Sequence, residues 1–109
     1  MTTTTITAGA SIATLINTFT VAPQRQRDIV DLLNRTTEET MRHLPGFIAT
    51  SIHASSDGTR VVNYAQWESV EAFQAMLRNP AAQQHMTELT ALSEAVDPHL
   101  YTVESTHRR

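Results

Sequence analysis

The sequence predicts an α+β domain with the ferredoxin-like βαββαβ arrangement, in which helices cover one face of a four-stranded antiparallel sheet. The pair Asp57-Gly58 separates two runs of alternating apolar and polar residues, which is typical of a tight β-hairpin. Apolar residues recur at helical spacing on both sides of that hairpin, and extended runs precede the first helix and follow the last. With right-handed crossovers, the first and third strands become central neighbours.

The first strand is expected from Ser11 to Val21, where both faces of the alternating pattern are partly apolar. Pro23 suits the first turn of a helix, since proline has no backbone N–H to leave unpaired. Apolar residues then recur at helical spacing until Leu44-Pro45-Gly46, which ends the helix. A second strand is expected from Phe47 to about Ser55.

The hairpin fixes which side chains share a face. A type I′ turn at the Asp-Gly pair needs positive φ at both central positions. If those two residues form the loop, Asn63 lies opposite Ile52 and Trp67 lies opposite Ile48, while His53 points to the other face. A bulge of one residue would reverse these faces.

Two helices and a last strand are expected after the hairpin. Ser69 is a candidate cap for a short helix, and Asn79-Pro80 begins the next one. Asp97-Pro98 is expected to end that helix, and residues 99 to about 106 form the last strand. The apolar residues of the two helices are Val70, Phe73 and Leu77 in the first, and Met86, Leu89 and Leu92 in the second.

Length and composition limit the organisation of the chain. The 109 residues suffice for one core, so we expect a flexible tail over residues 1–10 and one domain over residues 11–109. A formal net charge of -3 without a basic cluster argues against nucleic acid and membrane partners. The start of the chain has no secretory signal pattern and no apolar run is long enough to span a bilayer, so a cytoplasmic protein is expected.

The side chains available for chemistry are limited as well. The chain has no cysteine, which excludes a disulfide, a thiolate zinc site and a catalytic thiol. The five histidines show no pair at helical spacing that is typical of a metal site, so no metal is expected.

Polar side chains lie on the face that the helices should cover. The strand order brings Asn17 near Asn63 there, and Trp67 shares that face. An apolar wall with a few convergent polar groups is typical of a ligand site. The alternative is that the two amides bond each other or a loop and that Trp67 belongs to the core. The opposite face needs another cover, for which we expect a second copy of the chain; it carries Ile12, Ile16, Val62 and Tyr64.

A family resemblance rests on three segments, LINTFTV at 15–21, LPGF at 44–47 and above all SDGTRVVNYAQW at 56–67, with weaker matches from Phe73 to Tyr101. In these segments the chain resembles the antibiotic biosynthesis monooxygenase (ABM) family. The resemblance implies a dimeric ferredoxin-like fold of the α/β-barrel type. It also implies the chemistry of the cofactor-independent anthrone oxygenases of aromatic polyketide pathways, which convert an anthrone to a quinone with O2 and without metal, flavin or haem.

The resemblance implies that Asn17, Asn63 and Trp67 are catalytic residues, because they match positions where such enzymes bind or activate the substrate. A deprotonated polycyclic phenol is electron-rich enough to reduce O2, so the protein need only favour and hold the anion. Amide and indole donors can stabilise the developing oxyanion. The expected wall of the substrate pocket consists of Phe19, Phe47, Phe73, His85 and Met86.

The chain departs from some anthrone oxygenases in the expected proton relay. Those enzymes are similar but have a tyrosine at the position of Phe73, and an arginine near the position of His85-Met86. A phenylalanine cannot carry a proton. His85 has a reference pKa near 6.5 that suits an acid or base, but the more frequent place for a histidine is in solvent, here on the surface of its helix.

Two other functions stay open. One is a non-catalytic dimer that binds a small aromatic metabolite, because a fold does not determine a function. The other is a haem-degrading monooxygenase, for which Asn17 and Trp67 fit, but the helix after Trp67 has no histidine to serve as an axial ligand.

Overall fold

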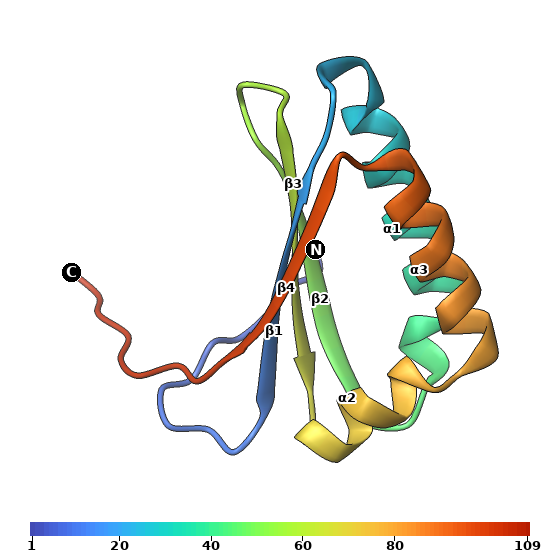
Figure 1. The fold of residues 1–109 in the computed structure, drawn as a ribbon. Coiled ribbons are helices and arrows are strands. Elements are labelled where there is room, and N and C mark those ends of the chain that lie inside the picture. Colours follow the sequence, from blue (N-terminus) through green and yellow to red (C-terminus); the bar gives the residue numbers. More distant parts are fainter.

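The computed structural model describes residues 1–109, which form four strands, three α-helices and two short 3-10 turns. Their order is β1 (Ala13–Thr20), η1 (Pro23–Arg25), α1 (Gln26–Glu39), η2 (Met41–His43), β2 (Phe47–Ala54), β3 (Arg60–Trp67), α2 (Val70–Leu77), α3 (Pro80–Leu92) and β4 (Ala95–Tyr101). The antiparallel strands are arranged as β2-β3-β1-β4, and the helices lie on one side of the sheet (Figure 1). The predicted ferredoxin-like fold is confirmed.

The central pair of strands, β1 and β3, holds the two asparagines together. Asn17 is the direct partner of Asn63 in the antiparallel register. Directly opposed residues in such a pair project from the same face, with Cβ atoms about 5 Å apart. The predicted adjacency of the two amides is therefore confirmed.

The core lies between the sheet and the helices and consists of two clusters. One joins Phe19 and Val61 of the sheet to Ile29 of α1 and Leu89 of α3. The other joins strand residues to Met76 of α2 and Ala82 of α3, and its strand residues are Ala13, Leu15, Ala65 and Trp67. Burying a large apolar side chain stabilises a fold by about 1.5–3 kcal/mol, so both clusters hold the helices on the sheet.

The β2–β3 loop keeps the predicted register with a different turn. Asn63 lies opposite Ile52, as expected. The expected type I′ turn is wrong, because Gly58 has positive φ (80°) and Asp57 does not. The Asp57 carboxylate instead accepts hydrogen bonds from Thr59 N (3.0 Å), Thr59 Oγ1 and Ser55 Oγ. The backbone bond from Thr59, followed by the two hydroxyls, lowers the pKa of Asp57 to about 2.

A bulge at the start of β2 changes the partner of Trp67. The expected partner was Ile48, but the register shifts between Phe47 and Ala49 and pairs Trp67 with Phe47. The two rings meet edge to face, with centroids 5.5 Å apart. Ile48 is pushed outward and is 43% exposed. The bulge lies beyond Asn63, so Asn63 and Trp67 stay on the predicted face.

The last strand begins earlier than expected. The predicted strand from residue 99 to about 106 is wrong, since β4 runs from Ala95 to Tyr101. Asp97-Pro98 does not end α3, which stops at Leu92. Pro98 lies within β4, and a strand at the edge of the sheet tolerates a residue without a backbone N–H.

The apolar face of α2 also differs from the predicted stripe. Met76 is the buried residue of this helix, whereas Val70 and Leu77 are exposed. The helix is only two turns long, so a stripe of three apolar residues did not determine its rotation. The predicted cap is present, because Ser69 Oγ accepts a hydrogen bond from Ala72 N at 3.0 Å.

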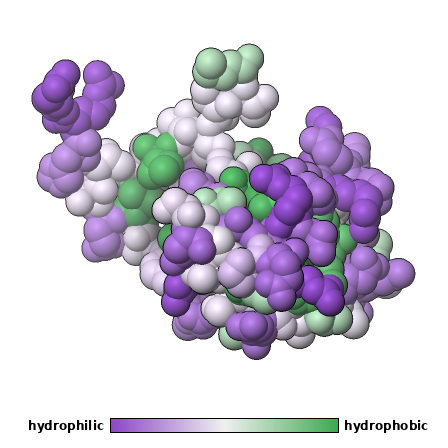
Figure 2. All heavy atoms as spheres, turned by 90° about the horizontal axis from the view of Figure 1, so that it is seen from above, coloured by the Kyte–Doolittle hydropathy of each residue, from purple (hydrophilic) through white to green (hydrophobic).

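The N-terminal residues contact the sheet face opposite the helices. Gln66 Nε2 donates to Thr5 O (2.8 Å), and the Thr4 and Ser51 hydroxyls are 3.0 Å apart. Gln66 is thereby buried, while Ile16 and Val62 on the same face are only half-buried. Seen from above, the surface is mostly hydrophilic with smaller hydrophobic areas between (Figure 2). None of the helices has the length and apolar composition needed to cross a membrane.

Gly46 sets the approach of α2 to the start of β2, which leads to a stability prediction. Its φ is +84°, and a Cβ atom there would lie 2.4 Å from Ala72 Cβ. Gly58 has a similar φ of +80°, but its added Cβ would meet Pro23 at an ordinary 3.5 Å. Gly58→Ala should therefore lower the free energy of unfolding by about 1–2 kcal/mol for the left-handed backbone alone. Gly46→Ala should lower it by about 1–3 kcal/mol more, because of the clash.

Urea denaturation of Gly46→Ala, Ala72→Gly and the double variant measures that clash. The double variant should be more stable than the sum of the single effects predicts. Equal losses in Gly46→Ala and Gly58→Ala, with additive effects in the double variant, would contradict the close contact with Ala72.

Candidate active site between the sheet and the helices

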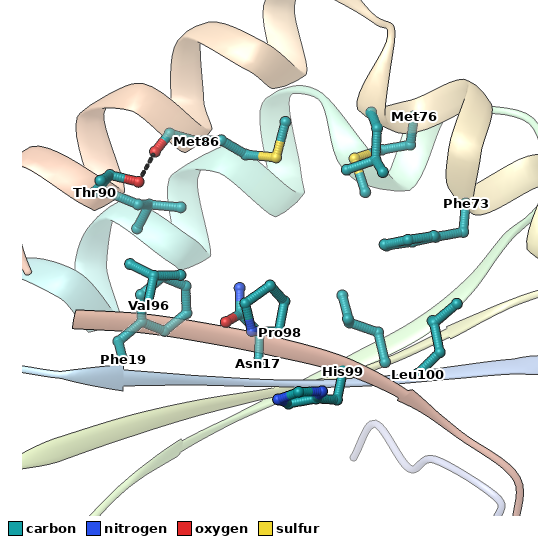
Figure 3. Close-up of a pocket in the computed structure, with 13 residues that line it drawn as sticks. Asn17, Phe19, Phe73, Met76, Met86, Thr90, Val96, Pro98, His99 and Leu100 are labelled. Carbon is teal, nitrogen blue, oxygen red and sulfur yellow. Dashed lines mark hydrogen bonds between the residues drawn. The ribbon is translucent and has the colours of Figure 1, made fainter.

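A large cavity opens between the sheet and helices α2 and α3. Its volume is about 360 Å³, and nine of its thirteen lining residues are hydrophobic. The lining residues are Leu15, Asn17, Phe19, Phe73, Met76, Leu77, Met86, Leu89, Thr90, Val96, Pro98, His99 and Leu100. Phe73, Met76 and Met86 face Asn17 and Pro98 across this space (Figure 3). The size and the apolar wall suit a small organic molecule with several rings.

Asn17 supplies the free polar group of this cavity. It lies in the middle of β1, and its amide projects from the strand toward the helices (Figure 3). Its Oδ1 atom is buried and has no hydrogen-bond partner in the protein. The other polar side chain aimed at the cavity is Thr90, whose hydroxyl donates to Met86 O at 2.9 Å. An unpaired buried amide costs about 1–3 kcal/mol, which a bound ligand can recover by pairing with it.

A second, much smaller cavity adjoins the first. Its volume is about 40 Å³, and it is lined by Leu15, Thr37, Met41, Phe47, Thr50, Asn63, Ala65, Trp67 and Met76. Leu15 and Met76 line both cavities, so their side chains form the partition between them. The three residues expected to act together are thus divided, with Asn17 in the large cavity and Asn63 and Trp67 in the small one.

Asn63 and Trp67 present hydrogen-bond donors to the small cavity. Thr50 Oγ1 donates to Asn63 Oδ1, which leaves the NH2 group of the amide as the end available to a ligand. Trp67 is only 2% exposed, and its Nε1–H has no partner in the protein. The edge-to-face contact with Phe47 and the bulge in β2 hold the indole in place.

The other expected pocket residues are distributed as follows. Phe19, Phe73 and Met86 line the large cavity, and Phe47 lines the small one. His85 lines neither cavity. It lies on α3 with its Nε2 atom 3.0 Å from Thr40 Oγ1, at the end of α1. The helix turns Met86 toward the cavity and His85 toward α1, since adjacent residues of a helix point about 100° apart.

Several lining residues were not among the expected ones. Val96, Pro98 and Leu100 come from β4, whose start was placed too late in the sequence. Met76 was missed because the apolar face of α2 was predicted to include Leu77. Met76 is three residues after Phe73 and can lie on the same face of the helix. Thr50, which fixes the amide of Asn63, had no sequence signal of its own, because its role depends on the pairing of β2 with β3.

His99 is the one lining residue of the two cavities with an acid or base side chain, and that side chain points away from the cavity. The ring of His99 points to the opposite side of β4 from Asn17 (Figure 3). There its Nε2 atom lies 2.8 Å from Asp97 Oδ1, on the exposed face of the sheet. His53 also lies on that face, as predicted, because it pairs with Val62. No group of three His, Cys, Asp or Glu side chains is arranged to hold a metal ion.

Comparison with known proteins agrees with the fold. The family model described as antibiotic biosynthesis monooxygenase matches residues 12–88. The chain is 47% identical over 81 residues to tetracenomycin-F1 monooxygenase of Streptomyces glaucescens. The match covers 74% of this chain and 72% of that protein.

Two solved structures are similar over nearly the whole chain. The cofactor-independent oxygenase SnoaB from Streptomyces nogalater has a TM-score of 0.76 and 31% identity, and the match covers 89% of this chain and 97% of that one. The monooxygenase ActVA-Orf6 of Streptomyces coelicolor, in complex with nanaomycin D, has a TM-score of 0.78 and 28% identity. The match covers 92% of this chain and 93% of that one. The chain therefore belongs to the antibiotic biosynthesis monooxygenase family.

Proposed function

We propose that this monooxygenase uses O2 to oxidise an anthrone-like aromatic polyketide intermediate to a quinone, without metal, flavin or haem. The observation that carries the proposal is the large cavity, which offers about 360 Å³ of apolar space and one unpaired amide, Asn17. The relatives support the same class of ligand, since one is named for tetracenomycin F1 and another holds nanaomycin D.

The reaction needs no reagent beyond O2. The methylene carbon of the anthrone loses a proton, and the resulting anion spreads its charge over the ring system to the oxygen atoms. The anion reduces O2 and forms a C–O bond, which gives a hydroperoxide after one proton is taken up. Loss of water from that hydroperoxide breaks the O–O and C–H bonds and leaves the second carbonyl. One anthrone and one O2 thus yield one quinone and one water.

The protein contributes binding and charge stabilisation to this sequence. The amide of Asn17 donates to the oxygen on which negative charge develops, while its unpaired Oδ1 accepts from a neighbouring phenol. The apolar wall excludes water and strengthens both bonds. Because no base points into the cavity, the proton leaves to bulk water before the substrate is enclosed rather than to a side chain.

A non-catalytic dimer that binds an aromatic metabolite is the other candidate, since the same cavity would serve it. Oxygen uptake with emodin anthrone or dithranol, without added flavin or metal, distinguishes the two. Uptake well above the uncatalysed background supports the enzyme. Tight binding of several anthrones with no uptake above background would favour the binding protein.

We further propose that the donors of Asn63 and Trp67 stabilise the negative charge that develops in the reaction, which leads to a prediction about rate. Asn63→Ala and Trp67→Phe should each lower kcat by about tenfold or more, since each removes a donor used in the transition state. Asn34→Ala, which removes an exposed amide on α1, is the matched control and should keep the rate. Single-turnover kinetics measure the effect, and circular dichroism checks the fold. Unchanged rates in both variants would remove these residues from the mechanism.

The place of His85 outside the cavities leads to a prediction about pH. With no protein base at the substrate, kcat/KM should rise with pH along the ionisation of the anthrone itself. His85→Gln keeps a hydrogen-bonding side chain beside Thr40 and should leave that profile unchanged. The measurement is kcat/KM from pH 5 to 9 for both proteins. A limb of the profile that is present in the wild type and lost in the variant would instead identify His85 as the acid or base.

We also propose that two copies of the chain pair through the sheet face opposite the helices. Ile16 and Val62 are half-buried in the middle of this face, and Tyr101 near its edge is exposed. Light scattering coupled to gel filtration should give twice the chain mass for the wild type. Ile16→Glu should give the monomer, because it would place two charges in the interface. Val70→Glu, the same change at an exposed site on α2, should leave the dimer intact. A monomeric wild type would contradict the proposal.

A further inference from the structure

We propose that the N-terminal residues form a strap that competes with a second copy of the chain for the sheet face opposite the helices. The strap consists of residues 1–10, which precede β1. The inference rests on the pairing of two copies proposed above and adds a segment of the chain that controls it. In the single chain the strap lies on this face, and in the dimer the sheet of the partner takes its place.

One end of the strap is tied to the segment after β4, an edge strand of the sheet. Gly9 N donates to Val103 O at 3.0 Å, and the two terminal segments lie side by side there (Figure 1). The φ of Gly9 is +71°, so the chain turns at this point with a backbone conformation that favours glycine. The turn directs the rest of the strap over the sheet.

The other end of the strap reaches β3 and β2. Gln66 Nε2 on β3 donates to Thr5 O at 2.8 Å and to Tyr64 Oη at 3.2 Å. On β2, the opposite edge strand, Ser51 Oγ lies 3.0 Å from Thr4 Oγ1. The strap therefore crosses the sheet from one edge to the other.

The strap covers the polar part of this face and leaves the apolar part open. Thr14 and Gln66 are direct partners on β1 and β3, and they are only 2% and 3% exposed. Ile16 and Val62 project from the same face further along the two strands, and they are only half-buried. A second copy can therefore make its first contact at these apolar residues while the strap is still in place.

Complete pairing of two sheets leaves no room for the strap. Sheets that pack face to face lie about 10 Å apart, and their side chains fill the space between them. The strap lies in that same space, above Gln66. A partner that docks on Ile16 and Val62 therefore displaces the strap as the two sheets close.

The strap is bound weakly enough to be displaced. Thr4 is half-buried and the other nine residues of the strap are exposed, including Ile6 at 49%. The strap is held by hydrogen bonds, which water replaces with little net loss of free energy. Its residues also regain conformational freedom when they leave the sheet. The interface between two sheets, which buries apolar side chains, can therefore replace it.

Removal of the strap tests the competition. A chain that lacks residues 2–8 should dimerise with a Kd about tenfold lower than that of the wild type, measured by analytical ultracentrifugation over a dilution series. Gly9→Pro should lower the Kd as well, because proline has no N–H for Val103 O and cannot adopt positive φ. Thr2→Pro, at an exposed residue ahead of the three ties, is the control and should keep the wild-type Kd. An equal or higher Kd in both strap variants would overturn the inference.

A disulfide that locks the strap on the sheet gives the converse test. The chain has no cysteine, so Thr4→Cys with Ser51→Cys introduces its only two thiols. The two hydroxyl oxygens are 3.0 Å apart, which is close enough for a disulfide to replace them. The oxidised double variant should be a monomer at concentrations at which the wild type is a dimer, and reduction with dithiothreitol should restore the dimer. Mass spectrometry under denaturing conditions checks that the bond lies within one chain.

The two tests separate the strap from the proposed pairing. A dimer that persists in the oxidised double variant would refute the strap and leave the pairing of two copies standing. A monomeric wild type that dimerises once residues 2–8 are removed would refute the wild-type dimer and support the strap. If the chain stays monomeric with and without the strap, both proposals fail.

Discussion

The pairing of β1 with β3 is the constraint on which the site depends. Its register places Asn17 directly opposite Asn63 and turns both side chains toward the helices. A shift of one residue in either strand would send one amide to the other face of the sheet. The buried Phe19 and Val61, which are also partners in this register, hold it in place because they anchor the larger core cluster. Core packing toward one end of the β1–β3 pair therefore fixes the positions of Asn17 and Asn63 near its middle.

Polar groups in an apolar wall are a cost that the rest of the fold has to offset. Asn17 Oδ1 and Trp67 Nε1 are both buried without a partner in the protein. Each such group lowers stability by about 1–3 kcal/mol, a large share of the total stability of a small domain. A core of apolar residues at these positions would be more stable and would bind nothing. Two of the four buried unpaired side-chain atoms, those of Asn17 and Trp67, lie at the two cavities, whereas those of Thr36 and His85 lie at neither. A loss of stability at a cavity wall is expected where it serves ligand binding.

The sequence predicted the parts of this arrangement that follow from local patterns. The hairpin register placed Asn63 and Trp67 on the helix-covered face, and the element order placed Asn17 beside them. The division into two cavities could not be predicted, because it depends on where Leu15 and Met76 pack between β1 and α2. The bulge at Phe47 and the early start of β4 escaped prediction for a similar reason. Both depend on tertiary pairing that leaves no mark on the alternation of apolar residues.

The absence from the cavity of a side chain that acts as an acid or base is consistent with the proposed reaction, in which the organic substrate supplies the electrons and O2 accepts them. In the proposed reaction an anthrone supplies its own electrons, so the protein would have to favour the anion and bring O2 close to it. A neutral histidine or lysine beside the substrate would become a cation after taking the proton, and a cation there would hold back the electron that must leave for O2. Neutral donors avoid this, because under the proposed mechanism the amide of Asn17 would stabilise the anion without carrying a full charge.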